Sequence, residues 1–271
     1  MIDICTVVFE PELPVLRLQA RSIELHCQNL QPHNIFVIVN DQDACRVDPA
    51  WYGSLADRVQ VVYRSQFGNQ WSDNGWVSQQ ALKMLGSALS NNHWCMIVDA
   101  KTIFVRELAI TDLLVNGRAA VGSMPIYPVF EASRDITNQL FAIDLPAQLG
   151  PGGVPFFVEP HMVQSMIAYI ESRTGQTFAD YFQQQGRLTE FVLYSGWVWH
   201  CDQTFDQRYD PHSRIVPVNL CHSEVSQADR KLTAMQAPDV VTVSIHRHAW
   251  SQLTDQQQQQ YNDLLTDRGI Q

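Results

Sequence analysis

Short apolar runs in the first half of the chain predict buried β-strands. Residues Ile4 to Phe9, Ile35 to Val39, Val59 to Tyr63, Trp94 to Val98 and Ala119 to Met124 are mostly apolar segments. Runs of this kind are typical of parallel strands that are covered on both faces. We therefore expect these five segments to form a sheet.

In the segments between these apolar runs, apolar residues recur with the spacing of a helix. Residues Leu16, Ala20, Ile23 and Cys27 recur at steps of four, three and four, which places them on one face of a helix. A second helix is predicted from about Val77 to Leu89. Alternating strands and helices predict an α/β fold with a mostly parallel, Rossmann-like sheet flanked by helices.

The pattern becomes irregular after Met124, where Pro125 and Pro128 interrupt it. We expect one compact domain with a nucleotide-binding half at residues 1–124 and a smaller, irregular half at residues 125–271. The second half is expected to contain helices at Pro160 to Glu171 and Thr189 to Trp199, strands at Ile215 to Val218 and Val240 to Ile245, and a final helix that begins with a capping box of Thr254 and Gln257.

The charge balance limits the classes of partner. The 271 residues include 18 basic and 28 acidic side chains, which gives a net charge of −10. Binding to nucleic acid or to an anionic membrane surface requires clustered basic residues, so neither partner is expected. No apolar run approaches the ~20 residues that span a bilayer, and no charged leader precedes an apolar stretch at the start. We therefore expect a cytoplasmic protein without an integral membrane segment.

The six cysteines are scattered along the chain. They contain no C-x-x-C pair, and their spacing predicts buried thiols rather than a disulfide framework or a zinc ribbon. The six residues are Cys5, Cys27, Cys45, Cys95, Cys201 and Cys221.

Polar residues follow the predicted strands at the point where each strand ends. Ligands of an open parallel sheet bind at the carboxyl ends of its strands. The rule selects the strand-end positions Phe9 with Glu10, Asn40 with Asp41, Arg64 with Ser65, and Asp99 with Lys101. An alternative reading is that Asp99 caps the next turn and that Lys101 is solvated.

The predicted second helix carries a polar face. Helical spacing puts Trp76, Gln79, Gln80 and Lys83 on one side of the segment GWVSQQALK, and this helix leads into the strand that ends at Asp99. Two of only three lysines in the chain therefore belong to segments that converge on one crevice. The alternative is a solvated helix face with an incidental lysine.

The order of these motifs resembles that of GT-A glycosyltransferases. More narrowly, it is similar to a group of bacterial glycosyltransferase-like proteins that share W-x-x-Q-Q-x-x-K and D-A-K motifs. The later segments TEFVLYSGW, from Thr189 to Trp197, and VSIHRHAW, from Val243 to Trp250, extend the resemblance over nearly the whole chain.

The resemblance implies a GT-A-like fold that binds a nucleotide-diphosphate sugar in its first half and a saccharide or other hydroxyl acceptor in its second half. Phe9, Glu10, Asn40 and Asp41 correspond to positions that hold the base and the ribose. The helix face with Trp76, Gln79, Gln80 and Lys83 belongs to the same donor side. The family's D-x-D motif corresponds to residues 99–101, but the third position here is lysine, which cannot ligate a metal while it is protonated.

Two sources of positive charge can replace the complete D-x-D motif. The departing nucleotide diphosphate develops negative charge, and a positioned cation stabilises it. Either Mn²⁺ or Mg²⁺ binds through Asp99 and His246, or Lys101 and Lys83 supply the charge themselves. Arg247 could contact a phosphate with its planar guanidinium.

An inverting transfer also needs a base to accept the proton of the acceptor hydroxyl. Glu190 is the candidate, because it follows Thr189 at a predicted helix start. The alternative role is a carboxylate that interacts favourably with the helix dipole. Two classes of function remain: an active glycosyltransferase, and a catalytically silent glycosyltransferase-like protein that binds a nucleotide or a sugar. A phosphate-loop enzyme is disfavoured, because the chain lacks G-x-x-x-x-G-K-[ST].

Overall fold

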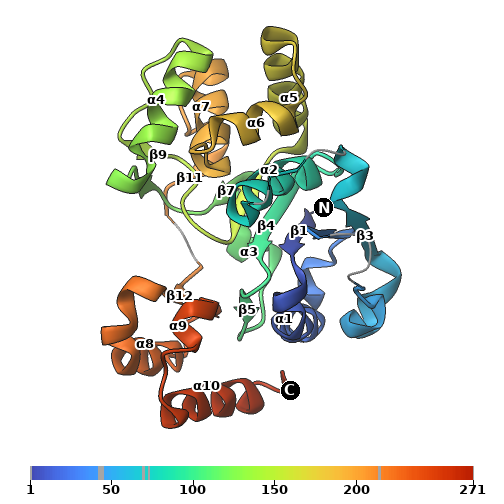
Figure 1. Cartoon of the computed structure of the whole chain (residues 1–271). Helices are drawn as coiled ribbons and strands as arrows, with labels where there is room; N and C mark the ends of the chain where they lie inside the picture. Colours follow the sequence, from blue (N-terminus) through green and yellow to red (C-terminus); the bar gives the residue numbers. More distant parts are fainter. Residues whose placement is uncertain (1, 42–45, 69–70, 73, 213–214, 271) are drawn as a thin grey trace.

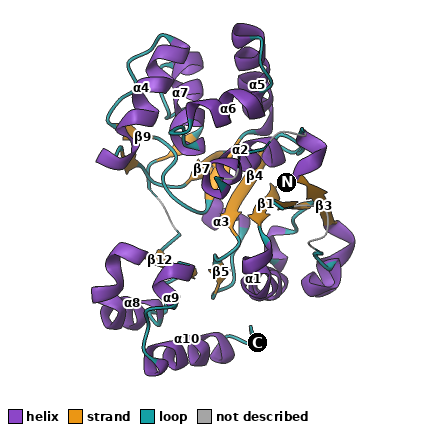
Figure 2. Cartoon of the chain, viewed as in Figure 1, coloured by secondary structure: helices purple, strands orange, loops and turns teal. Residues whose placement is uncertain are grey.

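The structure is a computed structural model that describes residues 2–41, 46–68, 71–72, 74–212 and 215–270 (Figure 1). It has a mixed α/β architecture with one larger sheet and three small ones. The larger sheet lies between helices (Figure 2).

The larger sheet has five strands in the order β10-β4-β1-β2-β3. Their bounds are Ile2–Val8 for β1, Ile35–Val39 for β2, Val59–Tyr63 for β3, Trp94–Asp99 for β4 and Phe156–Val158 for β10. The first four strands are parallel, which confirms the predicted parallel core. From β1 the chain adds β2 and β3 on one side and β4 on the other. The strand order therefore reverses between β1 and β4, and a crevice forms at such a reversal.

Two helices cover opposite sides of this sheet (Figure 2). Helix α1 spans Leu13–His26 and buries Leu16, Ala20 and Ile23, which confirms the predicted stripe. Helix α2 spans Gly75–Ser87 and packs so closely on the sheet that a Cβ at Gly86 would lie 2.6 Å from the side chain of Ile38. Glycine at this position permits the close approach.

The prediction of a fifth parallel strand at Ala119 to Met124 is wrong. Only Arg118–Ala120 (β7) and Met124–Pro125 (β8) are strands there, and they pair in small separate sheets with β6 (Leu114–Val115), β9 (Gln148–Leu149) and β11 (Tyr209–Asp210). The fifth strand of the larger sheet is β10, which runs antiparallel to β4. Its three residues are too few for a periodic signal.

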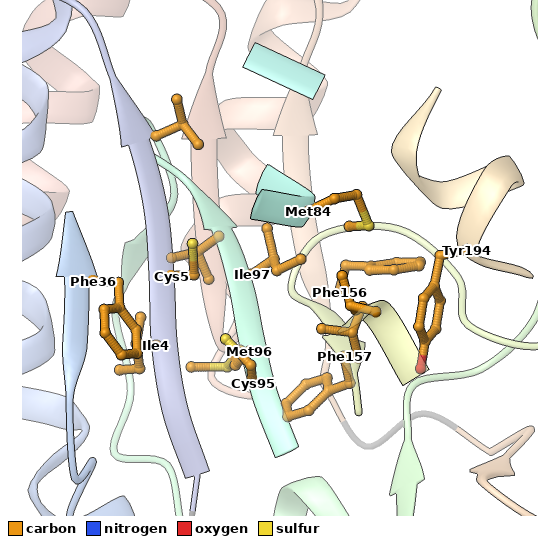
Figure 3. Close-up of a cluster of buried hydrophobic side chains, with 14 of the residues drawn as sticks. Ile4, Cys5, Phe36, Met84, Cys95, Met96, Ile97, Phe156, Phe157 and Tyr194 are labelled. Carbon is orange, nitrogen blue, oxygen red and sulfur yellow. The ribbon is translucent and has the colours of Figure 1, made fainter. Parts of the chain in front are cut away.

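Four helices of the second half lie together on the side of α2 (Figure 1). They are α4 (Glu131–Phe141), α5 (Pro160–Thr174), α6 (Phe178–Gln185) and α7 (Glu190–Asp202). Helices α5 and α7 confirm the predictions, whereas α4 and α6 were not predicted. Tyr194 of α7 packs edge-on against Phe156 of β10, with 5.9 Å between the ring centroids, and this contact joins the helices to the sheet core (Figure 3).

The C-terminal part forms a second hydrophobic cluster around a three-stranded sheet in the order β12-β13-β5. Strand β12 is Pro217–Leu220, β13 is Thr242–Ile245 and β5 is Ile103–Phe104. Helices α8 (Ala228–Met235), α9 (Arg247–Trp250) and α10 (Asp255–Asp267) accompany them. The capping box of Thr254 and Gln257 is confirmed.

Short helical turns complete the chain. They are α3 (Ile110–Leu113) and the 3-10 helices η1 (Glu10–Glu12), η2 (Gln28–Leu30), η3 (Pro49–Arg58), η4 (Arg64–Phe67), η5 (Pro128–Phe130) and η6 (His222–Gln227).

The cysteine prediction is confirmed for three residues and wrong for two. Cys5, Cys27 and Cys95 are buried free thiols, whereas Cys201 and Cys221 are exposed. The prediction for Cys45 lies outside the described residues.

No helix in the described ranges is long and apolar enough to cross a membrane.

Candidate functional site

A pocket of about 630 Å³ lies beside the carboxyl ends of β1 to β4. The ends of β1, β2 and β3 contribute Phe9, Asn40 and Arg64, and the turn after β4 contributes Lys101. Among the described residues, the lining consists of Phe9, Glu12, Asn40, Asp41, Arg64, Ser72, Asn74, Gly75, Trp76, Gln79, Lys101, His246, Arg247 and His248. Of the residues that the strand-end rule selects, Phe9, Asn40, Asp41, Arg64 and Lys101 thus line one pocket.

Helix α2 points its N-terminus toward this pocket. Asn74 caps the helix, because its side-chain oxygen accepts hydrogen bonds from the backbone N–H groups of Trp76 and Val77. Trp76, in the first turn, remains 48% exposed, and Gln79 lies one turn further along the same face. The cap fixes where the helix starts and so holds this polar face on the pocket wall.

The end of β2 contributes the polar side chains of Asn40 and Asp41 to the pocket lining. Asn40 is only 6% exposed, and its Nδ2 donates to the backbone oxygen of Gly75 at 3.2 Å. Its Oδ1 is buried and has no hydrogen-bond partner among the described residues. Next to it, Asp41 accepts a hydrogen bond through Oδ2 from the backbone N–H of Glu10. Glu10 itself is exposed and does not line the pocket, so its contribution is this backbone contact.

Basic residues also line the pocket, and the acidic Glu12 interacts with two of them, Lys101 and Arg247. The basic residues include Lys101, His246, Arg247 and His248, and the guanidinium of Arg247 lies over the ring of Phe9 at 4.9 Å from the centroid. Burial lowers the pKa of His246, and the charges of Lys101 and His248 lower it further. His246 therefore stays neutral to a lower pH than a free histidine does, and Lys101 and Arg247 carry the positive charge.

The pairing of β5 with β13 brings these cationic residues together. The strands are antiparallel, with Ile103 opposite Val243. Lys101 lies two residues before Ile103, and His246 lies three residues after Val243. A short ladder thus joins two segments that are about 145 positions apart in the sequence.

A chain of four charged side chains runs from the pocket wall into the core. Lys101 Nζ lies 2.7 Å from Asp99 Oδ2, Lys83 Nζ lies 2.7 Å from Asp99 Oδ1, and Lys83 Nζ lies 2.8 Å from Glu190 Oε1. The exposed fraction of the side chain falls along this chain from 24% at Lys101 through 17% at Asp99 and 4% at Lys83 to 0% at Glu190. Only its outer end lines the pocket.

The pKa shifts of these groups follow from burial and pairing. Burial alone would raise the pKa of Asp99, but Lys83 and Lys101 more than offset it and hold the pKa well below its usual range. Burial would lower the pKa of Lys83, yet Asp99 and Glu190 raise it above its usual value. Burial raises the pKa of Glu190, and Lys83 only partly compensates. Lys83 is therefore a firmly charged ammonium shared by two carboxylates.

Neighbouring residues hold these four charged side chains in place. Gln19 of α1 donates through Nε2 to the backbone oxygen of Asp99 and, at 3.0 Å, to that of Thr102. The amide of Gln80, oriented with its nitrogen toward Glu190, donates to that carboxylate. The ring of Phe191 lies 5.2 Å from Lys83 Nζ. The turn that carries Asp99 and Lys101 is thus held in place from its core side.

The predicted site residues lie in three places. Phe9, Asn40, Asp41, Trp76, Gln79, Lys101, His246 and Arg247 line the pocket, whereas Gln80, Lys83, Asp99 and Glu190 lie behind its wall and Glu10 lies outside it. Sequence reasoning assigned no role to Glu12 or Gln19. Gln19 carries a usable signal, since it is a polar residue next to Ala20 on the apolar face of α1. Glu12 follows Phe9 by three residues, in a proline-containing turn without a periodic pattern.

The two predicted metal ligands do not fit a divalent cation held by the protein. Both carboxylate oxygens of Asp99 already face an ammonium group, and His246 accepts a hydrogen bond from the backbone N–H of His248 through Nδ1. Mn²⁺ and Mg²⁺ require several oxygen or imidazole ligands that face one point. Within the described residues, no group of three or more His, Cys, Asp or Glu side chains could hold a metal ion.

The fold and the pocket define an α/β protein with a polar pocket at the carboxyl edge of a mostly parallel sheet. The chain belongs to a family of unknown function, DUF6492, whose model matches residues 9–251. The matched segment includes every residue of the pocket lining.

Comparison with solved structures finds similarity to the galactosyltransferase LgtC in complex with donor and acceptor sugar analogues. The TM-score is 0.47 and the sequence identity is 11%, and the alignment covers 99% of this chain and 100% of that chain. A search of curated proteins gives no match.

Proposed function

We propose that this protein is a GT-A type glycosyltransferase that moves a sugar from a nucleotide-diphosphate sugar to the hydroxyl group of a saccharide or other acceptor. The observation that carries the proposal is the mixed lining of the pocket, which combines the polar side chains of Asn40 and Asp41 with the cationic side chains of Lys101 and Arg247. A nucleotide diphosphate complements such a lining, since its base offers N–H donors and its diphosphate is anionic.

The proposed reaction needs a cation where the diphosphate departs. The acceptor oxygen attacks the anomeric carbon, the bond from that carbon to the phosphate oxygen breaks, and its electron pair leaves with the nucleotide diphosphate. Lys101 and Arg247 stabilise this charge, and removal of one such interaction typically slows a reaction by about 10²- to 10³-fold. Asp99 orients Lys101 through their 2.7 Å ion pair, and Lys83 holds Asp99 from behind.

We propose that Lys101 takes the part of a divalent ion. Its ammonium stands at the third position of the D-A-K sequence, and Asp99 is already neutralised by two lysines. Full activity of the unmodified protein after EDTA treatment would support this assignment. Loss of activity that Mn²⁺ or Mg²⁺ restores would overturn it in favour of a metal bound jointly by substrate and protein.

Glu190 is the proposed base that accepts the proton of the acceptor hydroxyl, and its side chain is completely buried. Its raised pKa makes it a stronger base than an ordinary carboxylate, but its Oε1 is paired with Lys83 in this conformation. Catalytic contacts often form only in the complex with substrate. In the Glu190→Gln variant, donor binding should persist and transfer should nearly vanish. Normal turnover in that variant would exclude Glu190 as the base.

The same burial favours a second candidate function, a protein that binds a nucleotide sugar without transferring it. Release of nucleotide diphosphate separates the two functions. The unmodified protein is incubated with UDP-, GDP-, CMP- and dTDP-sugars, and both binding and release of the nucleotide product are measured. Binding with release supports the transferase, binding without release supports the silent binder, and absence of binding to every nucleotide overturns both. The Lys231→Met variant is a control, because Lys231 pairs with Glu224 outside the pocket.

A further inference from the structure

Glu12 adds a carboxylate to the pocket lining that the fold itself does not use. The residue stands at the N-cap position of α1, but its side chain accepts no capping hydrogen bond. Within the described residues, this carboxylate forms neither a hydrogen bond nor an ion pair. The side chain is half-buried and lines the pocket. Its replacement should therefore leave the fold intact.

Two cations of the same lining act on Glu12 through their charges. Burial raises the pKa of Glu12, and the charges of Lys101 and Arg247 partly offset this rise. Lys101 is paired with Asp99, whereas Arg247 lies over the ring of Phe9 and has no carboxylate partner among the described residues. The cationic part of the pocket therefore contains a carboxylate that is not fixed in an ion pair.

A carboxylate in this place acts differently on the substrate and the product of a sugar transfer. In a nucleotide-diphosphate sugar, the terminal phosphate is esterified to the sugar. In the nucleoside diphosphate that remains after transfer, the same phosphate is free and gains negative charge, because the second pKa of a phosphate group is about 6. Like charges at close range repel. A nearby carboxylate therefore opposes the product more strongly than the substrate.

We propose that Glu12 is a specificity-determining residue that favours the nucleotide-diphosphate sugar over the nucleoside diphosphate product. Lys101 and Arg247 hold the diphosphate in both states, and the carboxylate of Glu12 repels the charge that appears when the sugar has left. Glu12 thereby promotes release of the product from these two cations. This proposal rests on the proposed function, because it deepens the specificity of the same pocket.

The first test measures the charge effect without a nucleotide. Inorganic pyrophosphate is titrated by calorimetry into the unmodified protein and the Glu12→Gln variant at pH 8 and low ionic strength. The variant should bind pyrophosphate roughly 3- to 30-fold more tightly, because a like charge has been removed from the pocket. Equal or weaker binding overturns the proposal, and so does absence of pyrophosphate binding to both proteins.

A matched variant controls for the change in net charge. Glu131→Gln removes the same charge, but Glu131 is exposed and does not line the pocket. This variant should bind pyrophosphate as the unmodified protein does. An equal gain in both variants would overturn the proposal in favour of a general effect of net charge.

The second test measures the selectivity between substrate and product. Dissociation constants are measured for UDP and UDP-glucose, GDP and GDP-mannose, and dTDP and dTDP-glucose on the unmodified protein and on both variants. For a pair that binds, the Glu12→Gln change should lower the preference for the sugar-bearing nucleotide by roughly 3- to 10-fold. An unchanged preference overturns the role of Glu12 and leaves the proposed function standing. Absence of binding by every pair overturns the proposed function and, with it, this proposal.

Discussion

Asp99 forms two ion pairs, an inner one with Lys83 on the core side and an outer one with Lys101 on the pocket side, and the two serve different purposes. Lys83 and Lys101 each lie 2.7 Å from one oxygen of this carboxylate, yet the side chain of Lys83 is 4% exposed and that of Lys101 is 24% exposed. Lys83 has a second carboxylate, Glu190, as a partner, whereas Lys101 lines the pocket. Equal distances therefore do not imply equal roles. The inner lysine stabilises the fold, and the outer lysine is available to a ligand.

The largest expected effect comes from removal of the inner lysine, Lys83. The Lys83→Met change leaves Glu190 buried without a counter-ion, and loss of one partner of a buried pair costs about 3–5 kcal/mol. Urea unfolding at pH 7 measures this loss. The Lys101→Met change should cost less than about 1 kcal/mol, as expected for a pair near the surface. Equal losses in the two variants would contradict the division between an inner and an outer lysine.

The next largest effect is expected from removal of the outer lysine, Lys101. The Lys101→Met change should lower the rate of nucleotide-diphosphate release by about 10²- to 10³-fold, because the departing charge loses its positioned cation. Steady-state assays with a donor that the unmodified protein accepts measure this rate. Lys231→Met is the matched control, since Lys231 is 23% exposed and pairs with Glu224 at 3.1 Å. A similar loss of rate in both variants would point to a general electrostatic effect.

A smaller effect measures the coupling between Lys83 and Glu190 on the inner side. If Glu190 stabilises the fold through Lys83, neutralising both residues should cost less than the sum of the single changes. The double variant Lys83→Met with Glu190→Gln should recover about 1–3 kcal/mol relative to additivity, measured by the same urea unfolding. Strict additivity would show that the 2.8 Å contact between these residues carries no coupling energy.

The smallest expected effect concerns the histidine at the outer side. The pKa of His246 is lowered in the folded chain, mainly by burial and then by Lys101. Between the folded and the unfolded pKa the unfolded chain binds more protons, so the free energy of unfolding falls as the pH drops below about 6.5. The His246→Gln change should reduce this loss by less than about 1 kcal/mol, because solvent screens a partly exposed ring. Unfolding curves at pH 7 and pH 5 provide the measurement. An unchanged pH dependence would show that other groups, such as His26 and His93, account for the loss.

The sequence predicted the parallel core and the position of the pocket because both depend on local patterns. Buried parallel strands such as β1 and β4 are continuous apolar runs, and the strand-end rule then selects Asn40, Asp41 and Lys101. Helical spacing grouped Lys83 with Trp76, Gln79 and Gln80, but Lys83 is buried behind the pocket wall and does not line the pocket. The parallel strands and the residues at their ends are predicted without knowledge of distant contacts.

The remaining features depend on contacts that leave no periodic signal. Strands β5 and β10 have two and three residues, and their partners lie far away in the sequence. The start of α7 was predicted, but nothing in its almost uniformly apolar sequence shows that Glu190 faces inward. A charged residue at a helix start usually faces solvent, so its complete burial emerged only from the packing around Lys83.

The pairing of β5 with β13 also sets the order in which the pocket can be completed during synthesis. Asn40, Asp41 and the outer lysine, Lys101, leave the ribosome early, whereas Arg247 follows about 145 residues after Lys101. At the usual ~5–20 residues per second, the delay after Lys101 amounts to roughly 7–30 seconds. A nascent chain that has formed β1 to β4 therefore contains Asn40, Asp41 and Lys101 of the pocket but still lacks Arg247. Capacity to bind an anionic ligand should emerge late and abruptly, when β13 closes on Ile103.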